Sequence, residues 1–116
     1  METATARKRL EQMRDELERS IAVLTGDQER DDRALDYPQD PADAGANLSE
    51  SERTEAVLHV ARGQRAEVLD ALRRIEAGTY GTCADCGNQV PEGRLQARPE
   101  AARCVSCQAK WARMRR

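Results

Sequence analysis

Large aromatic side chains are almost absent from this chain of 116 residues. It has no phenylalanine, and Trp111, Tyr37 and Tyr80 are its only aromatic residues. A globular core without large aromatic side chains is hard to fill, so the sequence argues against a compact sandwich. Hydrophobic residues make up 39% of the chain, many of them alanine, and 34% of the residues are charged. This composition is typical of long exposed helices, and the periodic apolar residues described below argue against the alternative of outright disorder.

Long apolar runs are also missing. No run approaches the length that spans a membrane, and no apolar signal core follows the first residues. We therefore expect a cytoplasmic protein without membrane contact, whose thiols stay reduced. The net charge of −2 identifies no partner, but the segment 27–43 holds seven acidic residues and two arginines. The segment 94–116 holds seven basic residues and one acidic residue, so the middle is acidic and the C-terminal part basic.

Two segments carry the narrow apolar stripe of a coiled-coil seam. The first covers residues 5–24, and its stripe consists of Leu10, Met13, Leu17 and Leu24. The second begins at Ser49, which has the spacing of a capping box with Glu52. It should end near residue 77, because Gly78 can supply a left-handed stop. Its stripe consists of Leu58, Ala61, Val68, Leu72 and Ile75.

The two stripes most simply pack against each other as an antiparallel hairpin, because isolated helices are marginal in water. The segment 26–48 between them contains Pro38, Pro41 and Gly45, which discourage one continuous helix. We expect an acidic, irregular tip there, with part of it, about residues 28–35, still helical.

All four cysteines fall in two C-x-x-C pairs, Cys83 with Cys86 and Cys104 with Cys107, with seventeen residues between the pairs. This spacing lies in the range of four-cysteine zinc sites. Zinc takes four thiolates in a tetrahedron at about 2.3 Å, and a site closed by four protein ligands is structural rather than catalytic. Gly87 lets the first turn close with positive φ. Two redox-active pairs or an iron–sulfur centre are the alternatives, although no βαβ pattern supports the first.

The predicted fold class is therefore mainly α: a long antiparallel helical hairpin, or coiled coil, on a small four-cysteine zinc-finger base with a C-terminal helix. The hairpin would cover residues 1–78, with the acidic tip around 26–48, and the finger with the last helix residues 79–116. His59, the single histidine, falls mid-helix and is expected to be solvated. Trp111 is expected to pack the last helix against the finger or the base of the hairpin.

The C-terminal end is basic and consists of Lys110, Arg113, Arg115 and Arg116. Basic side chains near a helix C-terminus complement the helix dipole, which by itself accounts for them. They are also candidates for contact with phosphate groups or with an acidic partner.

Three stretches of the sequence resemble the DksA/TraR C4-type zinc finger. They are Gly78-Thr-Tyr-Gly-Thr-Cys83-Ala-Asp-Cys86-Gly, then Arg94-Leu-Gln-Ala-Arg-Pro99, and then Cys104-Val-Ser-Cys107. The resemblance covers about residue 40 to the end, and the hairpin upstream fits as well. It implies a long antiparallel coiled coil on a globular zinc-finger base. Members resembling DksA bind RNA polymerase directly, and their coil enters the secondary channel. The resemblance therefore implies a non-enzymatic transcription regulator, expected to act as a monomer.

The resemblance also assigns a role to the tip. In members resembling DksA the tip reads Asp-Pro-x-Asp-x-Ala, and its two acids lie near the polymerase active site. Here Asp40-Pro41-Ala42-Asp43-Ala44-Gly45 keeps both acids and the proline, whereas Gly45 replaces the alanine. Asp40 and Asp43 are thus the candidate tip acids. A solvated turn is the alternative, because Asp and Pro are turn formers.

The alarmone (p)ppGpp works with some family members through basic residues. Arg98 matches one of these basic positions and is a candidate partner contact, but the other two positions hold Glu67 and Gln108. An alarmone response is therefore not expected. A zinc-finger nucleic-acid-binding module that uses the basic tail is the alternative function. Direct specific DNA binding is not expected, because a DNA binder spreads basic residues over its reading surface, and the projecting tip here is acidic.

Overall fold

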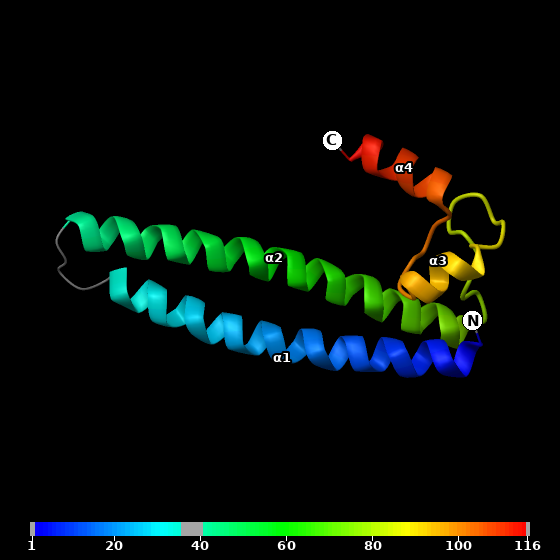
Figure 1. Ribbon diagram of the computed structural model, residues 1–116, viewed down its shortest axis with the longest axis horizontal. Coiled ribbons are helices and arrows are strands. Elements are labelled where there is room, and N and C mark those ends of the chain that lie inside the picture. The colour runs from blue at the N-terminus through cyan, green and yellow to red at the C-terminus, as the bar shows by residue number, and fades with distance from the viewer. Residues whose placement is uncertain (1, 36–40, 116) are drawn as a thin grey trace. The chain divides into compact units, whose positions relative to one another are not determined.

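The computed structural model describes residues 2–35 and 41–115, and the side chains within them except those at 31, 32, 34, 35, 41–44, 46 and 47. The described ranges contain four helices: α1 (Thr3–Leu35), α2 (Pro41–Ala77), α3 (Glu92–Ala97) and α4 (Val105–Met114) (Figure 1). The only strand-like pairing in the described ranges is an isolated antiparallel bridge between Thr82 and Gln89. The mainly α fold is as predicted. Within these ranges, no helix combines the length and the apolar character needed to cross a membrane.

The two long helices extend further than predicted. α1 continues without a break to Leu35, which confirms the helical stretch predicted at about residues 28–35, and α2 begins at Pro41 rather than at Ser49. The prediction of an irregular tip over residues 26–48 was therefore wrong in its bounds. Proline is favourable at the first position of a helix, where its missing N–H is not needed. A glycine inside a helix, such as Gly45, costs only about 1 kcal/mol.

The end of α2 was predicted correctly. Gly78 has a φ of 76°, and its amide donates to the carbonyl of Ile75 at 3.2 Å. The amide of Thr79 donates to the carbonyl of Arg74 at 2.9 Å. These two bonds form a Schellman motif, which requires a left-handed residue directly after the helix. The chain can therefore turn sharply from α2 into the cysteine-containing segment.

The described chain forms two compact units, residues 15–65, and residues 1–14 together with 66–116. In the first unit α1 and α2 run antiparallel, as Figure 1 shows, and Leu58 and Ala61 are buried. Arg65 interrupts the apolar stripe of α2 and pairs with Glu18 of α1 at 3.1 Å. Because both side chains of this ion pair are exposed, the buried apolar residues account for most of the stability of this unit.

The second unit, called the base unit below, joins the ends of both long helices to the cysteine-containing segment. Ala6 and Leu10 of α1 are buried with residues of the α2 stripe. An exposed ion pair between Arg7 and Glu76 links the two helices at 3.0 Å. Leu72 is only half-buried, and its neighbour Ala71 is buried instead. The buried residues that α2 contributes here are Val68, Ala71 and Ile75.

Candidate metal centre

The first cysteine pair lies in a tight hairpin. The amide of Cys83 donates to the carbonyl of Asn88 at 2.8 Å, and the amide of Gly87 donates back to the carbonyl of Cys83 at 3.1 Å. Gly87 has the positive φ, 76°, that was predicted from the motif. A residue with a Cβ adopts this conformation only with strain. The closed turn brings the thiols of Cys83 and Cys86 to the same place.

The second cysteine pair opens α4. Cys104 is the extended N-cap residue of this helix, and Cys107 lies in its first turn. The amide of Cys104 donates to the sulfur of Cys83 at 3.4 Å. The amide of Ala84 donates to the carbonyl of Ala102 at 2.9 Å. Hydrogen bonds donated by backbone amides therefore hold the two pairs together.

The four Sγ atoms of Cys83, Cys86, Cys104 and Cys107 all lie within 4.8 Å of one another. A tetrahedral ion with zinc–sulfur bonds of about 2.3 Å has sulfur–sulfur edges of about 3.8 Å. The Sγ atoms of Cys86 and Cys104 are 4.0 Å apart. All four cysteines are free of disulfide bonds. The donor set, its number and its spacing therefore fit one structural zinc ion.

The electrostatics of the cluster favour a cation. The backbone amide of Cys86, and next that of Cys104, lower the pKa of the Cys83 thiol to about 6 because they stabilise its thiolate. The Cys104 thiol, followed by burial, raises the pKa of Cys107 to about 12. Several thiolates cannot crowd together without a compensating positive charge, and a divalent ion supplies this charge.

The loop of residues 99–103, called the strap below, leads from α3 to the second cysteine pair. The hydroxyl of Tyr80 donates to the carbonyl of Pro99 at 2.9 Å. Nε of Arg94 donates to the carbonyl of Arg103 at 2.8 Å. Burial raises the pKa of Tyr80, so the phenol keeps the proton that it donates. Side chains from outside the strap therefore fix both of its ends.

Arg74, in the last turn of α2, holds the middle of the strap. Its Nη2 donates to the carbonyl of Glu100 at 3.3 Å, and its Nη1 to the carbonyl of Ala101 at 3.4 Å. Nε of Arg74 pairs with Asp70 at 3.1 Å, and only 14% of the arginine side chain is exposed. Nothing in the sequence signals this role, because an arginine near a helix C-terminus is already explained by the helix dipole.

Trp111 of α4 is half-buried beside the cysteine cluster. The guanidinium carbon of Arg103 lies 4.7 Å from the centroid of its ring, and that of Arg115 lies 4.6 Å away. Nε of Arg103 also donates to Asp85, between the first two cysteines, at 2.8 Å. Arg103 thereby links the first cysteine pair to α4.

The other predicted contact residues are placed as follows. Lys110, Arg113 and Arg115 are exposed on α4 or at its end, and Arg98 is exposed and pairs with Glu100 at 3.2 Å. Asp40 and Arg116 lie outside the described residues, and the side chain of Asp43 does too. His59 is exposed on α2, as predicted. The candidate acids at the tip thus stay a sequence prediction.

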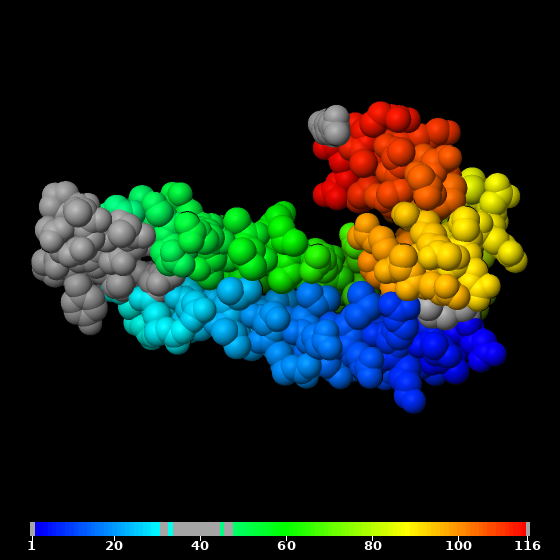
Figure 2. Space-filling model, in the orientation of Figure 1, coloured from blue at the N-terminus to red at the C-terminus, as the bar shows by residue number. Residues whose placement is uncertain are grey.

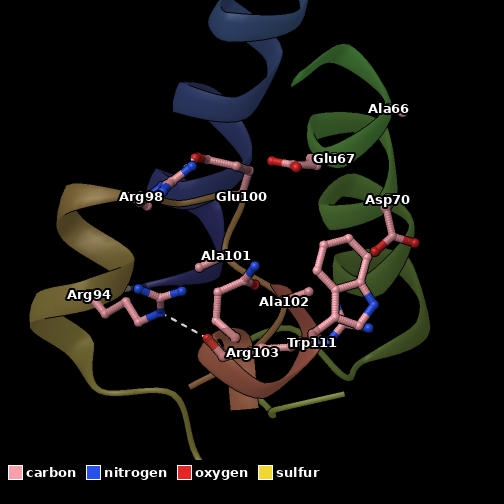
Figure 3. Close-up of a pocket in the computed structure, with 11 residues that line it drawn as sticks. Ala66, Glu67, Asp70, Arg94, Arg98, Glu100, Ala101, Ala102, Arg103 and Trp111 are labelled. Atoms are coloured by element: carbon pink, nitrogen blue, oxygen red, sulfur yellow. Dashed lines mark hydrogen bonds and ion pairs between the residues drawn. The ribbon is translucent and has the colours of Figure 1, made fainter. Parts of the chain in front are cut away.

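A cavity of about 240 Å³ lies in the base unit between α2, the strap and α4 (Figure 3). Glu67, Arg98 and Gln108, the three positions compared with the alarmone-linked basic residues, all line it. Arg94 and Trp111 contribute to its wall as well. Its charge is mixed, because its lining includes the acidic residues Glu67, Asp70 and Glu100 as well as the arginines Arg94, Arg98 and Arg103.

The cysteine cluster lies in a segment with a known pattern. Residues 78–110 match the family model of the prokaryotic dksA/traR C4-type zinc finger. The chain is also 37% identical over 70 residues to an uncharacterized protein of Aquifex aeolicus, covering 60% of this chain and 48% of that protein. It is 29% identical over 96 residues to the RNA polymerase-binding transcription factor DksA of Escherichia coli, covering 83% of this chain and 59% of that protein. The chain thus spans about half the length of these relatives.

A solved structure extends the likeness beyond the finger. The structure of transcription factor DksA2 from Pseudomonas aeruginosa matches this chain with a TM-score of 0.79 and 25% identity. The match covers 97% of this chain and 84% of that one. The likeness therefore includes the long helices as well as the segment that matches the dksA/traR C4-type zinc finger.

Proposed function

We propose that this chain is a transcription regulator of the DksA/TraR type that binds RNA polymerase. The observation that carries the proposal is the cysteine cluster, which fits one zinc ion and lies inside the segment matching the dksA/traR finger. The similarity to DksA2 over nearly the whole chain supports the same conclusion. DksA of Escherichia coli is itself described as an RNA polymerase-binding transcription factor.

In this proposal the parts of the chain have separate roles. Residues 1–78 are the hairpin that enters the polymerase channel, and residues 79–116 are the zinc finger with its C-terminal helix. Cys83, Cys86, Cys104 and Cys107 hold a structural zinc ion. With four protein ligands the ion has no open coordination position, so it activates no water. It stabilises the fold and takes no part in catalysis. The protein is a non-enzymatic, monomeric, cytoplasmic regulator.

The tip acids Asp40 and Asp43 are the proposed effectors. They follow the Asp-Pro-x-Asp pattern of the tip, and Pro41 is the first residue of α2. The first turn of a helix is a favourable place for an acid, because the helix dipole is positive there. The two negative charges would act on the polymerase active site by electrostatics.

The regulator is proposed to act without an alarmone. Among the three compared positions that line the cavity, Arg98 pairs with Glu100, and the other two are Glu67 and Gln108. A carboxylate on the cavity wall repels a polyanion such as (p)ppGpp. Equilibrium dialysis against (p)ppGpp, of the chain alone and of its complex with the polymerase, should therefore show no alarmone bound in the cavity of the chain. The double substitution Glu67→Lys with Gln108→Lys should increase the binding of (p)ppGpp.

The first experiment tests polymerase binding. The full chain is immobilised and mixed with purified RNA polymerase, with and without an excess of competing duplex DNA. We expect retention of the polymerase that DNA does not abolish. If only DNA is retained, with the steep salt dependence of phosphate contacts, the basic tail is a nucleic-acid-binding element and the alternative function is correct.

The second experiment separates the tip from the tail. Asp43→Asn removes one charge and keeps the size of the side chain. Glu29→Gln is the matched control, because Glu29 is an exposed acid on α1. Asp43→Asn should leave polymerase binding and the melting temperature nearly unchanged. It should reduce the regulatory effect in a purified transcription assay, and the control should not. Loss of effect only in Arg115→Ala with Arg116→Ala would contradict the role of the tip.

A further inference from the structure

α4 has few attachments to the rest of the base unit. No residue of this ten-residue helix is buried, and Val105 and Met114 are largely exposed. Figure 2 shows it beside the strap, with much of its surface uncovered on the side in view. A helix of this length is marginal in water by itself. Its position therefore depends on its cysteines and on the half-buried Trp111.

Arg103 is placed to control that position. It directly precedes Cys104, and Arg94 fixes its carbonyl at 2.8 Å. Its side chain is only 21% exposed and pairs with Asp85 at 2.8 Å. The same guanidinium stacks on the indole of Trp111. One side chain thus contacts the turn of the first cysteine pair and the middle of α4.

We propose that Arg103 is a positioning residue that couples zinc binding at the cysteine cluster to the placement of α4. Asp85 sits in the two-residue turn between Cys83 and Cys86, so its place is set when both thiolates bind the ion. A fixed Asp85 holds the guanidinium of Arg103 against the indole of Trp111. The arginine then orients α4 and the basic side chains that the helix exposes, among them Lys110.

Loss of zinc releases these contacts one after another. The turn that carries Asp85 relaxes, because formation of a metal site and folding around it are one equilibrium. Arg103 then loses its carboxylate partner and no longer stays in one orientation over the ring. Loss of a cation–π contact shifts the equilibrium between attached and detached α4 by about fivefold. The basic end of the chain is therefore presented in a defined direction only in the zinc-bound protein.

The inference rests on the zinc site and not on the proposed binding of RNA polymerase. A failure of the polymerase experiments leaves it unaffected. A failure of the experiment below leaves the role of the tip acids unaffected.

Trp111 is the only tryptophan of the chain, so its fluorescence reports on α4 directly. The test compares the full zinc-loaded chain with Arg103→Gln, Asp85→Asn and Arg103→Lys. Arg113→Gln is the matched control, because it removes the same charge from an exposed position of α4. Zinc content is measured for each protein by atomic absorption. Quenching of Trp111 by acrylamide is then measured before and after addition of a chelator.

Chelation should increase acrylamide quenching in the wild-type protein. Zinc-loaded Arg103→Gln and Asp85→Asn should already show increased quenching, while Arg113→Gln stays at the wild-type level. Arg103→Lys keeps a cation for both contacts and should restore part of the protection. The proposal is overturned if zinc-loaded Arg103→Gln is quenched like the wild type. If Arg103→Gln does not retain zinc, zinc-loaded Asp85→Asn is the deciding variant. Quenching of this variant at the wild-type level then overturns the proposal.

Discussion

At the scale of single residues, Arg74 joins the end of α2 to the strap. It lies in the last turn of α2, and its guanidinium donates to two successive carbonyls of the strap, those of Glu100 and Ala101. If a half-buried carbonyl loses its hydrogen-bond donor, the protein is destabilised by the free energy of desolvating that carbonyl. The strap leads directly to Cys104, so the same arginine also helps to place the second cysteine pair.

Arg74→Met keeps most of the aliphatic stem and removes all the donors. We expect it to lower the free energy of unfolding by about 2–3 kcal/mol, because hydrogen bonds to charged groups are worth about 1.5–3 kcal/mol. Arg73→Met is the matched control. The side chain of Arg73 is 70% exposed, and its ion pair with Asp70 is long at 3.6 Å. Its loss should therefore lower the free energy of unfolding by less than about 0.5 kcal/mol. Urea unfolding of the zinc-loaded proteins measures both, and equal costs would contradict the role of Arg74.

At the scale of elements, the two long helices depend on a narrow apolar seam. Leu58 is completely buried in the unit of residues 15–65, whereas His59 beside it is exposed. An exposed ion pair such as that between Arg65 and Glu18 contributes little. The seam must therefore supply most of the stability of the coil.

Leu58→Ala should lower the free energy of unfolding by about 2–5 kcal/mol, the usual cost of a cavity in a core. His59→Ala should change it by less than about 0.5 kcal/mol. Chemical unfolding followed by circular dichroism compares the two neighbours. The seam assignment fails if the histidine variant is the less stable one.

The glycine at the start of α2 makes a second prediction about the same element. Among the described residues, no side chain or other segment of the chain lies within 4 Å of a Cβ built at Gly45, and the φ of this glycine is not positive. Gly45→Ala should therefore stabilise α2 by about 0.5–1 kcal/mol through the lower entropy of the unfolded chain. Gly78→Ala is the control, because its φ of 76° makes an alanine strained. It should destabilise, and thermal melts of the two variants should shift in opposite directions.

At the scale of the whole molecule, the zinc site concerns only part of the chain. α1 and α2 contain 33 and 37 residues, and α3 and α4 contain 6 and 10. The small core around Cys83, Val90 and Leu95 lies within the segment that the metal holds. Most of the helical structure therefore does not depend directly on zinc.

Purified protein should carry about one zinc ion per chain, and Cys104→Ser should abolish binding, because closed structural sites use all four ligands. Chelation should expose the amides of residues 79–110 to hydrogen exchange, since metal binding and local folding are coupled. Amides of residues 15–65 should keep their protection. Loss of protection throughout both units would show that the coil also depends on the metal.

The sequence alone determined the features that depend on local chemistry and periodicity. Two cysteine pairs at the right spacing predicted the zinc cluster, the stripes predicted the antiparallel helices, and Gly78 and Gly87 predicted the turns that need a positive φ. Each of these follows from a few residues close together in the chain. For the same reason the motif of the finger could be matched from short stretches.

Only the tertiary structure decided the features that join distant residues. The start of α2 at Pro41 was decided by the structure, because proline is favourable both in a turn and at the first position of a helix. The contacts of Arg74 with the strap span 26 and 27 residues. Arg103 reaches Asp85 across 18 residues. No periodicity marks such contacts, because an arginine side chain is long enough to bond whichever carbonyl or carboxylate the fold brings near it.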